Sequence, residues 1–223
     1  MIEVFFDESH TANPGRFLVG GVAYADPGAT EERLVGLQRT LAATNHYWAG
    51  TNDGSREMFS AHGFHHTDDP HLVKEAMYTQ LNELDFRGHF AWMSPVAGFT
   101  DVQHYLYLYR SILTGLAIRY SAVDVKFVFE QHPTMNRLFE PLVRHAEQQA
   151  NTPQGKIEVL VGSKASPCLS TVDYLMAVLN TALRPFAPAH ERRRVHSLNS
   201  KIAHLYDADF DYHTSSTDAM IDK

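Results

Sequence analysis

The chain begins with a short apolar run that leads directly into two carboxylates. Residues 2–6 are mostly β-branched and aromatic, and Asp7 and Glu8 follow without a break. Such a run is typical of a central strand that is covered on both faces. Carboxylates that close a buried strand are costly unless they meet a positive partner, and a divalent cation makes several of them tolerable together. The sequence therefore predicts a buried strand that ends at an acidic, cation-binding site.

Composition favours one folded domain in a reducing compartment. The chain has 223 residues, 44% of them hydrophobic and 20% charged, as in an ordinary globular protein. Cys168 is the single cysteine, which excludes an internal disulfide. A secretory signal pattern is missing, and no apolar stretch approaches the ~20 residues of a membrane span. We expect a cytoplasmic protein with no membrane contact, one domain at residues 1–206, and an acidic, weakly ordered tail at residues 207–223.

The formal net charge of −7 weakens a nucleic-acid-binding function without excluding it. Proteins that grip the phosphate backbone usually present a basic face. A cluster of basic residues in a sequence predicts either a surface that contacts phosphates or an ordinary solvated face. The basic residues of this chain gather near the C-terminus, at Arg184, Arg192, Arg193, Arg194 and Lys201.

The order of the predicted elements indicates an α/β fold with a mixed, five-stranded sheet flanked by helices. Two strands joined by the Asn13-Pro14-Gly15 turn should pair antiparallel. A helical insertion at about residues 29–85 follows, with a long polar stretch at residues 44–69. The later strands alternate with helices and must make parallel crossovers. We expect those strands at residues 87–95, 123–129 and 157–161, and a last helix at residues 195–205. This is the layout of the ribonuclease H-like fold, in which acids from the first strand, the fourth strand and the last helix meet on one side of the sheet.

Four acids occupy positions that suit metal-ion chemistry. Asp7 closes the first predicted strand, Glu130 closes the strand at residues 125–129, Asp173 lies on a helix that is apolar almost all round, and Glu57 lies in the long polar stretch. Carboxylates held by strand ends and a packed helix suit ligation of a hard cation. Two such ions, ~3.5–4 Å apart, would clamp the attacking and leaving oxygens of a phosphodiester. Each acid also has an ordinary structural interpretation, as a turn cap or as the partner of a surface lysine.

Phe6-Asp7-Glu8-Ser9 and Val172-Asp173-Tyr174 match motifs of a known protein family. Through them the chain resembles domain-of-unknown-function family 3800, whose members have a ribonuclease H-like fold. The resemblance covers most of the chain. Glu130 stands where the family usually has aspartate, and Arg56-Glu57-Met58-Phe59-Ser60-Ala61 matches a family motif only loosely. The stronger motifs are Phe6-Asp7-Glu8-Ser9, the Phe17-Leu18-Val19-Gly20-Gly21 strand, and Ser163-Lys164-Ala165-Ser166-Pro167-Cys168-Leu169 leading to Val172-Asp173-Tyr174.

The resemblance implies a Mg²⁺- or Mn²⁺-dependent nuclease or related phosphodiesterase that acts on a nucleic acid or a nucleotide. Asp7, Glu130 and Asp173 would be metal ligands, with Asp7 bridging two ions. Glu57 would be a fourth ligand or would orient the attacking water. Lys164 would contact a substrate phosphate, or it is a solvated turn lysine. Because glutamate is longer than aspartate, Glu130 could shift the metal geometry or lose one ion. The alternative is therefore a catalytically inactive module of the same shape that binds a nucleotide, a nucleic acid or a protein partner. With either function, the chain could bind a protein partner or form a homo-oligomer.

A histidine-rich segment at residues 62–71 is a competing candidate metal site. His62, His65 and His66 lie close together in sequence with several acids, and imidazoles at short spacing bind zinc and other transition metals. No cysteine and no His-Glu-x-x-His helix supports the site. One of these histidines could instead be a proton shuttle beside the carboxylates. A serine or cysteine hydrolase is disfavoured because no Gly-x-Ser-x-Gly motif occurs.

Overall fold

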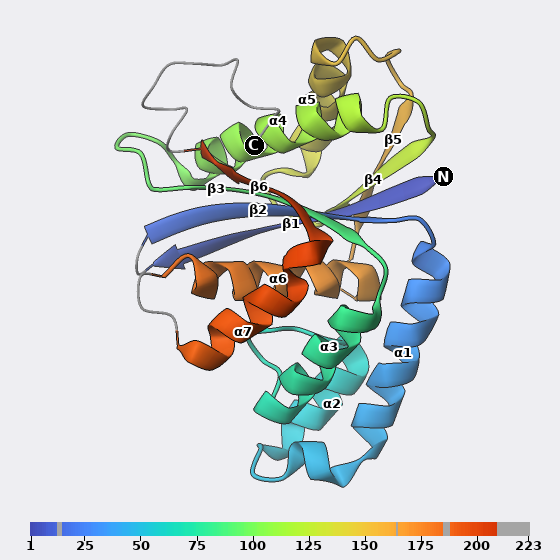
Figure 1. The fold of residues 1–223 in the computed structure, drawn as a ribbon, viewed down its shortest axis with the longest axis vertical. Helices are drawn as coiled ribbons and strands as arrows, with labels where there is room; N and C mark the ends of the chain where they lie inside the picture. The colour runs from blue at the N-terminus through green and yellow to red at the C-terminus, as the bar shows by residue number, and fades with distance from the viewer. Residues whose placement is uncertain (13–14, 164, 185–187, 209–223) are drawn as a thin grey trace.

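The computed structural model describes residues 1–12, 15–163, 165–184 and 188–208. Within these ranges, six strands form one mixed sheet in the order β5-β4-β1-β2-β3-β6 (Figure 1). Its antiparallel pairs are β1–β2 and β2–β3, and its parallel pairs are β1–β4, β4–β5 and β3–β6. The strands are β1 (Ile2–Ala12), β2 (Gly15–Tyr24), β3 (Arg87–Met93), β4 (Val125–Glu130), β5 (Ile157–Gly162) and β6 (Ile202–Asp207). The predicted α/β class and mixed sheet are confirmed, and the predicted number of five strands was one too few.

Helices cover both faces of the sheet. Figure 1 shows α4 and α5 on one face, and α6, α7 and the group α1 to α3 on the other. No helix in the described part of the chain is both long and apolar enough to cross a membrane. The α-helices are α1 (Pro27–Ala43), α2 (Asp53–His62), α3 (His71–Glu83), α4 (Asp101–Arg119), α5 (Asn136–Gln149), α6 (Pro167–Ala182) and α7 (Ala189–Leu198), with short 3-10 helices η1 (Asn45–Trp48) and η2 (Asn199–Lys201).

The central strand β1 sends alternate side chains to two separate hydrophobic cores. Phe6 belongs to the core beneath α4, where it contacts the ring of Tyr109, and Phe5 belongs to the core on the α6 side. Because side chains alternate along a strand, Asp7 faces α6 and Glu8 faces α4. The Tyr109 hydroxyl donates a hydrogen bond of 2.6 Å to Glu8 Oε2. The two adjacent acids therefore have different environments, and only Asp7 lies on the α6 face.

The prediction that Asp7 ends the first strand is wrong. The antiparallel pairing of β1 with β2 runs without a break from Glu3 opposite Tyr24 to Ala12 opposite Gly15. The hairpin ladder therefore continues beyond Asp7, because β2 provides a backbone partner at every position. Asp7 lies inside a strand, which holds its side chain more firmly than a turn would.

The predicted long loop at residues 44–69 contains η1 and α2. A few apolar residues anchor this segment: the rings of Trp48 and Phe59 pack together, and the Trp48 indole N–H donates a hydrogen bond of 2.9 Å to the carbonyl of Leu41. These anchors are too widely spaced to show a helical period in the sequence. Tertiary packing therefore stabilises helices that the local pattern does not predict.

The predicted C-terminal helix at residues 195–205 is also wrong. Helix α7 ends at Leu198, and the chain then forms β6, which pairs parallel with β3. The exposed edge of β3 offers unpaired backbone groups, and a short segment of alternating residues can satisfy them as a strand. Asp207, predicted to begin the tail, belongs to β6, and residues 209–223 lie outside the described residues.

Candidate active site: a carboxylate cavity on the α6 face

Asp7, Glu130 and Asp173 line one small cavity, although they are far apart in the sequence. β1 and β4 pair in parallel, with Phe6 opposite Phe129. The residues that follow this pair, Asp7 on β1 and Glu130 on β4, therefore lie side by side on the same face of the sheet. Both acids are buried, with 7% of each residue exposed. The sheet thus brings two carboxylates together at one point, as the sequence predicted.

Helix α6 supplies the third carboxylate from above this face. It begins at Pro167, whose fixed backbone angle suits a first helical turn, and most of its side chains are buried. Leu169 and Ser170 lie four and three residues before Asp173, so both are neighbours of Asp173 on one side of the helix. These three residues line the cavity. Asp173 therefore faces the cavity. The apolar residues around it in the sequence predicted that this acid would either face a cleft or be paired.

Burial and neighbouring negative charges make Asp7 reluctant to ionise. Burial is the largest cause that raises the pKa of Asp7, followed by the charges of Glu130, Glu8 and Asp173. The backbone N–H of Glu8 donates a hydrogen bond of 2.7 Å to Asp7 Oδ1, which acts in the opposite direction. Within the described residues, the charges that shift this pKa are all negative. A cation in the cavity would relieve this repulsion.

The turn between α2 and α3 is tied to α6 through two acids. The backbone N–H of His66 donates a hydrogen bond of 2.8 Å to Asp173 Oδ2. Asp69 Oδ2 accepts hydrogen bonds from the His65 backbone N–H, at 3.0 Å, and from the Tyr174 hydroxyl, at 2.5 Å. Burial raises the pKa of Asp69 to about 6, and both hydrogen bonds oppose that rise. The turn thereby fixes Asp173 and brings His65 to the lining of the cavity.

The donor chemistry of the cavity fits a hard cation. Carboxylate oxygens are the ligands that Mg²⁺ and Mn²⁺ prefer. The cavity has about 10 Å³ of space, which suits one water-sized occupant. As the side chains stand, no three His, Cys, Asp or Glu residues in the described ranges are arranged to hold a metal ion. Repelling carboxylates are expected to stand apart until a positive charge compensates them, so binding of ions requires a side-chain adjustment.

Of the five predicted site residues, three line this cavity, one does not, and one cannot be placed. Glu57 lies on α2 with an exposed side chain and does not line the cavity. Lys164 lies outside the described residues. Ser170 lines the cavity, although the sequence pattern alone did not single it out as a site residue. Its position three residues before Asp173 on a helix was the available signal.

The histidine-rich segment does not form a separate metal site in the described residues. His62 is exposed on α2, His65 lines the carboxylate cavity, and the His66 ring shares a hydrogen bond of 2.9 Å with the Tyr78 hydroxyl. Burial lowers the pKa of His66 to about 4, so its ring is neutral near pH 7. The three imidazoles therefore have different surroundings, and His65 is the one placed beside the carboxylates.

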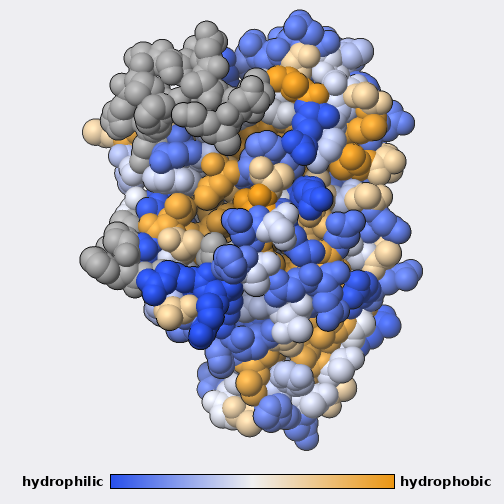
Figure 2. Space-filling model, viewed as in Figure 1, coloured by the Kyte–Doolittle hydropathy of each residue, from blue (hydrophilic) through white to orange (hydrophobic). Residues whose placement is uncertain are grey.

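The basic residues near the C-terminus do not form one free face. Figure 2 shows hydrophilic side chains gathered over α7, where Arg192 and Arg193 are exposed. Arg194, in contrast, forms an ion pair with Glu75. Lys201 donates a hydrogen bond to the carbonyl of Leu84. Part of the predicted cluster is thus used in internal contacts.

Comparison with protein-family models finds no family that matches this chain, and comparison with curated protein sequences finds no match either. The function of the chain must therefore be inferred from the residues of the carboxylate cavity and their geometry.

Proposed function

We propose that this chain is a divalent-metal-dependent nuclease or related phosphodiesterase with a ribonuclease H-like core. The observation that carries the proposal is the convergence of Asp7, Glu130 and Asp173, from two strands and a helix, on one cavity. The position of β1 between antiparallel β2 and parallel β4 supports a ribonuclease H-like interpretation of the sheet. Because one fold can host many functions, the proposal depends on the three acids and not on the fold.

In this proposal the three carboxylates hold Mg²⁺ or Mn²⁺ through their oxygens. Once the side chains have moved apart to admit them, a pair of such ions would supply an activated water and stabilise the leaving oxygen of a phosphodiester. The chain contributes rigidity: Asp7 and Glu130 lie on paired strands, and the His66 backbone N–H orients Asp173. His65 lines the same cavity, and in this proposal it would exchange a proton with a bound substrate.

The exposed position of Glu57 is the observation that favours a second function. Without this residue the cavity has three acids in place of the four that the sequence suggested. A ribonuclease H-like module with an incomplete ligand set would bind a nucleotide, a nucleic acid or a protein partner without cleaving it. The same cleavage assay distinguishes the two functions.

The experiment is incubation with end-labelled single- and double-stranded RNA and DNA in the presence of Mn²⁺. We expect cleavage by the wild type and a loss of more than about 100-fold in Asp173→Asn, because residues that only support a metal ligand already contribute about 10–100-fold. Glu158→Gln, an exposed acid on β5, is the matched control and should cleave normally. Absence of cleavage by the wild type, or undiminished cleavage by Asp173→Asn, would contradict the enzyme proposal.

A further inference from the structure

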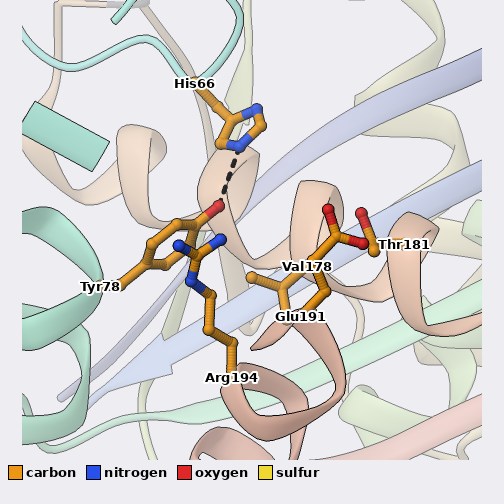
Figure 3. Close-up of a pocket in the computed structure, with 6 residues that line it drawn as sticks. All are labelled: His66, Tyr78, Val178, Thr181, Glu191 and Arg194. Carbon is orange, nitrogen blue, oxygen red and sulfur yellow. Dashed lines mark hydrogen bonds between the residues drawn. The ribbon is translucent and has the colours of Figure 1, made fainter. Parts of the chain in front are cut away.

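A second cavity, of about 80 Å³, lies beside the carboxylate cavity. His66 lies between the two cavities. Its side chain lines the second cavity, and its backbone N–H donates a hydrogen bond to Asp173, which lines the carboxylate cavity. Along α6, the lining residues Val178 and Thr181 follow Asp173 by five and eight residues, which is roughly 7–12 Å at 1.5 Å per residue. That distance corresponds to a few stacked nucleotides at about 3.4 Å each. Figure 3 shows the lining residues His66, Tyr78, Val178, Thr181, Glu191 and Arg194.

Glu191 contributes an unsatisfied hydrogen-bond acceptor to this cavity. Its Oε2 atom is buried and has no hydrogen-bond partner among the residues that the structure describes. A buried carboxylate oxygen without a donor is costly, and such atoms are rare in folded proteins. Figure 3 shows the carboxylate at the end of the Glu191 side chain on the Thr181 side of the cavity. The occupant must therefore offer N–H or O–H groups, which disfavours a bare phosphate.

Arg194 provides the complementary donors on the other side. Its guanidinium lies over the Tyr78 ring, 4.5 Å from the ring centre, and it pairs with Glu75. A guanidinium has five N–H donors, so these contacts leave donors for another acceptor. The Tyr78 hydroxyl is fixed by its hydrogen bond to His66. The cavity thus presents an acceptor on Glu191 and donors on Arg194.

We propose that this cavity binds the guanine base of a polynucleotide strand that flanks the cleaved bond. Guanine presents two adjacent donors, N1–H and the 2-amino group, which suit the Glu191 carboxylate, and its O6 acceptor suits Arg194. Adenine and cytosine have an amino donor without a neighbouring ring N–H, and uracil and thymine lack the amino group. A cavity of about 80 Å³ would take the hydrogen-bonding edge of the base, and the rest of the ring would remain outside it. Glu191 and Arg194 are only partly buried, so a strand on the surface can reach them. This inference rests on the proposed function, which brings a nucleic-acid strand to α6.

The test measures binding of the full chain to 5′-labelled octanucleotides by fluorescence anisotropy, with Ca²⁺ in place of Mn²⁺. The oligonucleotides are uridine or thymidine octamers that carry one central guanine, hypoxanthine or adenine, so the ribose and deoxyribose series identify the polymer. We expect the guanine octamer to bind about tenfold more tightly than the adenine octamer, which is about 1.4 kcal/mol. Hypoxanthine, which lacks the 2-amino group, should lie between them.

Variants assign the effect to the cavity. Glu191→Gln removes the charge and one acceptor, and we expect its preference for guanine to fall to within about twofold. Glu32→Gln, an exposed acid on α1, is the matched control and should keep the preference. Equal binding of guanine and adenine octamers by the wild type would overturn the inference whether or not the variant folds. A guanine preference that persists in folded Glu191→Gln would also overturn it.

The outcome for this cavity can be separated from the outcome for the carboxylate cavity. A guanine preference that depends on Glu191, without Mn²⁺-dependent cleavage, would support the base-binding cavity and contradict the nuclease proposal. Cleavage that depends on Asp173, without a guanine preference, would support the nuclease proposal and contradict the base-binding cavity.

Discussion

Asp7→Asn should make the metal-free protein more stable than the wild type at pH 7. In the wild type, burial and the charges of Glu130, Glu8 and Asp173 raise the pKa of Asp7. The ionised form of Asp7 therefore destabilises the folded state. Asparagine has nearly the same shape, carries no charge and can still accept the hydrogen bond from the Glu8 backbone N–H. A gain of about 1 kcal/mol or more would raise the unfolding midpoint by roughly 2–4 °C in a domain of this size.

The pH dependence of this gain has a definite sign. A carboxyl group whose folded-state pKa is raised favours the folded state below its unfolded pKa of about 3.9, and that contribution is lost as the pH rises through the folded-state pKa. The difference between Asp7→Asn and the wild type should therefore be small near pH 4 and should grow toward pH 7. Thermal unfolding in EDTA at several pH values measures it, with the exposed acid variant Asp85→Asn as a control. A destabilised Asp7→Asn protein at pH 7 would show that Asp7 has a positive or strongly hydrogen-bonded partner in the fold.

Glu130→Gln and Glu57→Gln should affect Mn²⁺-dependent cleavage very differently. Glu130 lines the carboxylate cavity and is buried, so loss of its charge removes one ligand from the proposed site. We expect cleavage to fall by more than about 100-fold, since a ligand contributes at least as much as the residues that support it. Glu57 is exposed on α2 and does not line the cavity, so Glu57→Gln should remain within about twofold of the wild type.

This pair of variants decides which acids form the site. The assay is the rate of cleavage of the best labelled substrate at saturating Mn²⁺, after thermal unfolding has shown that both variants are folded. A large loss in Glu57→Gln would mean that α2 moves toward the cavity when substrate binds. Normal cleavage by Glu130→Gln would remove Glu130 from the set of ligands and leave too few acids for the proposed chemistry.

The parts of the fold with strong local patterns could be predicted from the sequence. The apolar runs that form β1 and β4 have the composition of doubly covered strands, and the nearly all-apolar α6 had to be buried. A carboxylate in such an element is costly unless it is paired or binds a cation. This cost made Asp7, Glu130 and Asp173 candidates for a metal site. Asp7 and Glu130 meet because β1 and β4 pair in parallel, and α6 adds Asp173 from above the same face. The alternating order of elements predicted parallel crossovers but not this register.

The parts that depend on tertiary contacts could not be predicted in this way. β6 forms because the edge of β3 offers backbone partners, and α2 forms because Phe59 packs against Trp48. The second cavity brings Tyr78, Thr181 and Glu191 together from three helices with no shared spacing in the sequence. The exposed position of Glu57 depends on the same unpredicted helix, so sequence reasoning could not place it relative to the other acids.

Direct titration of the metal-free protein with Mn²⁺, followed by calorimetry, tests the claim that three remote carboxylates form one cation site. We expect saturable binding by the wild type, and an affinity at least about tenfold lower in both Asp7→Asn and Asp173→Asn, with Glu57→Gln unchanged. Absence of Mn²⁺ binding by the wild type, or equal affinity in the wild type and in folded Asp7→Asn and Asp173→Asn proteins, would contradict the account.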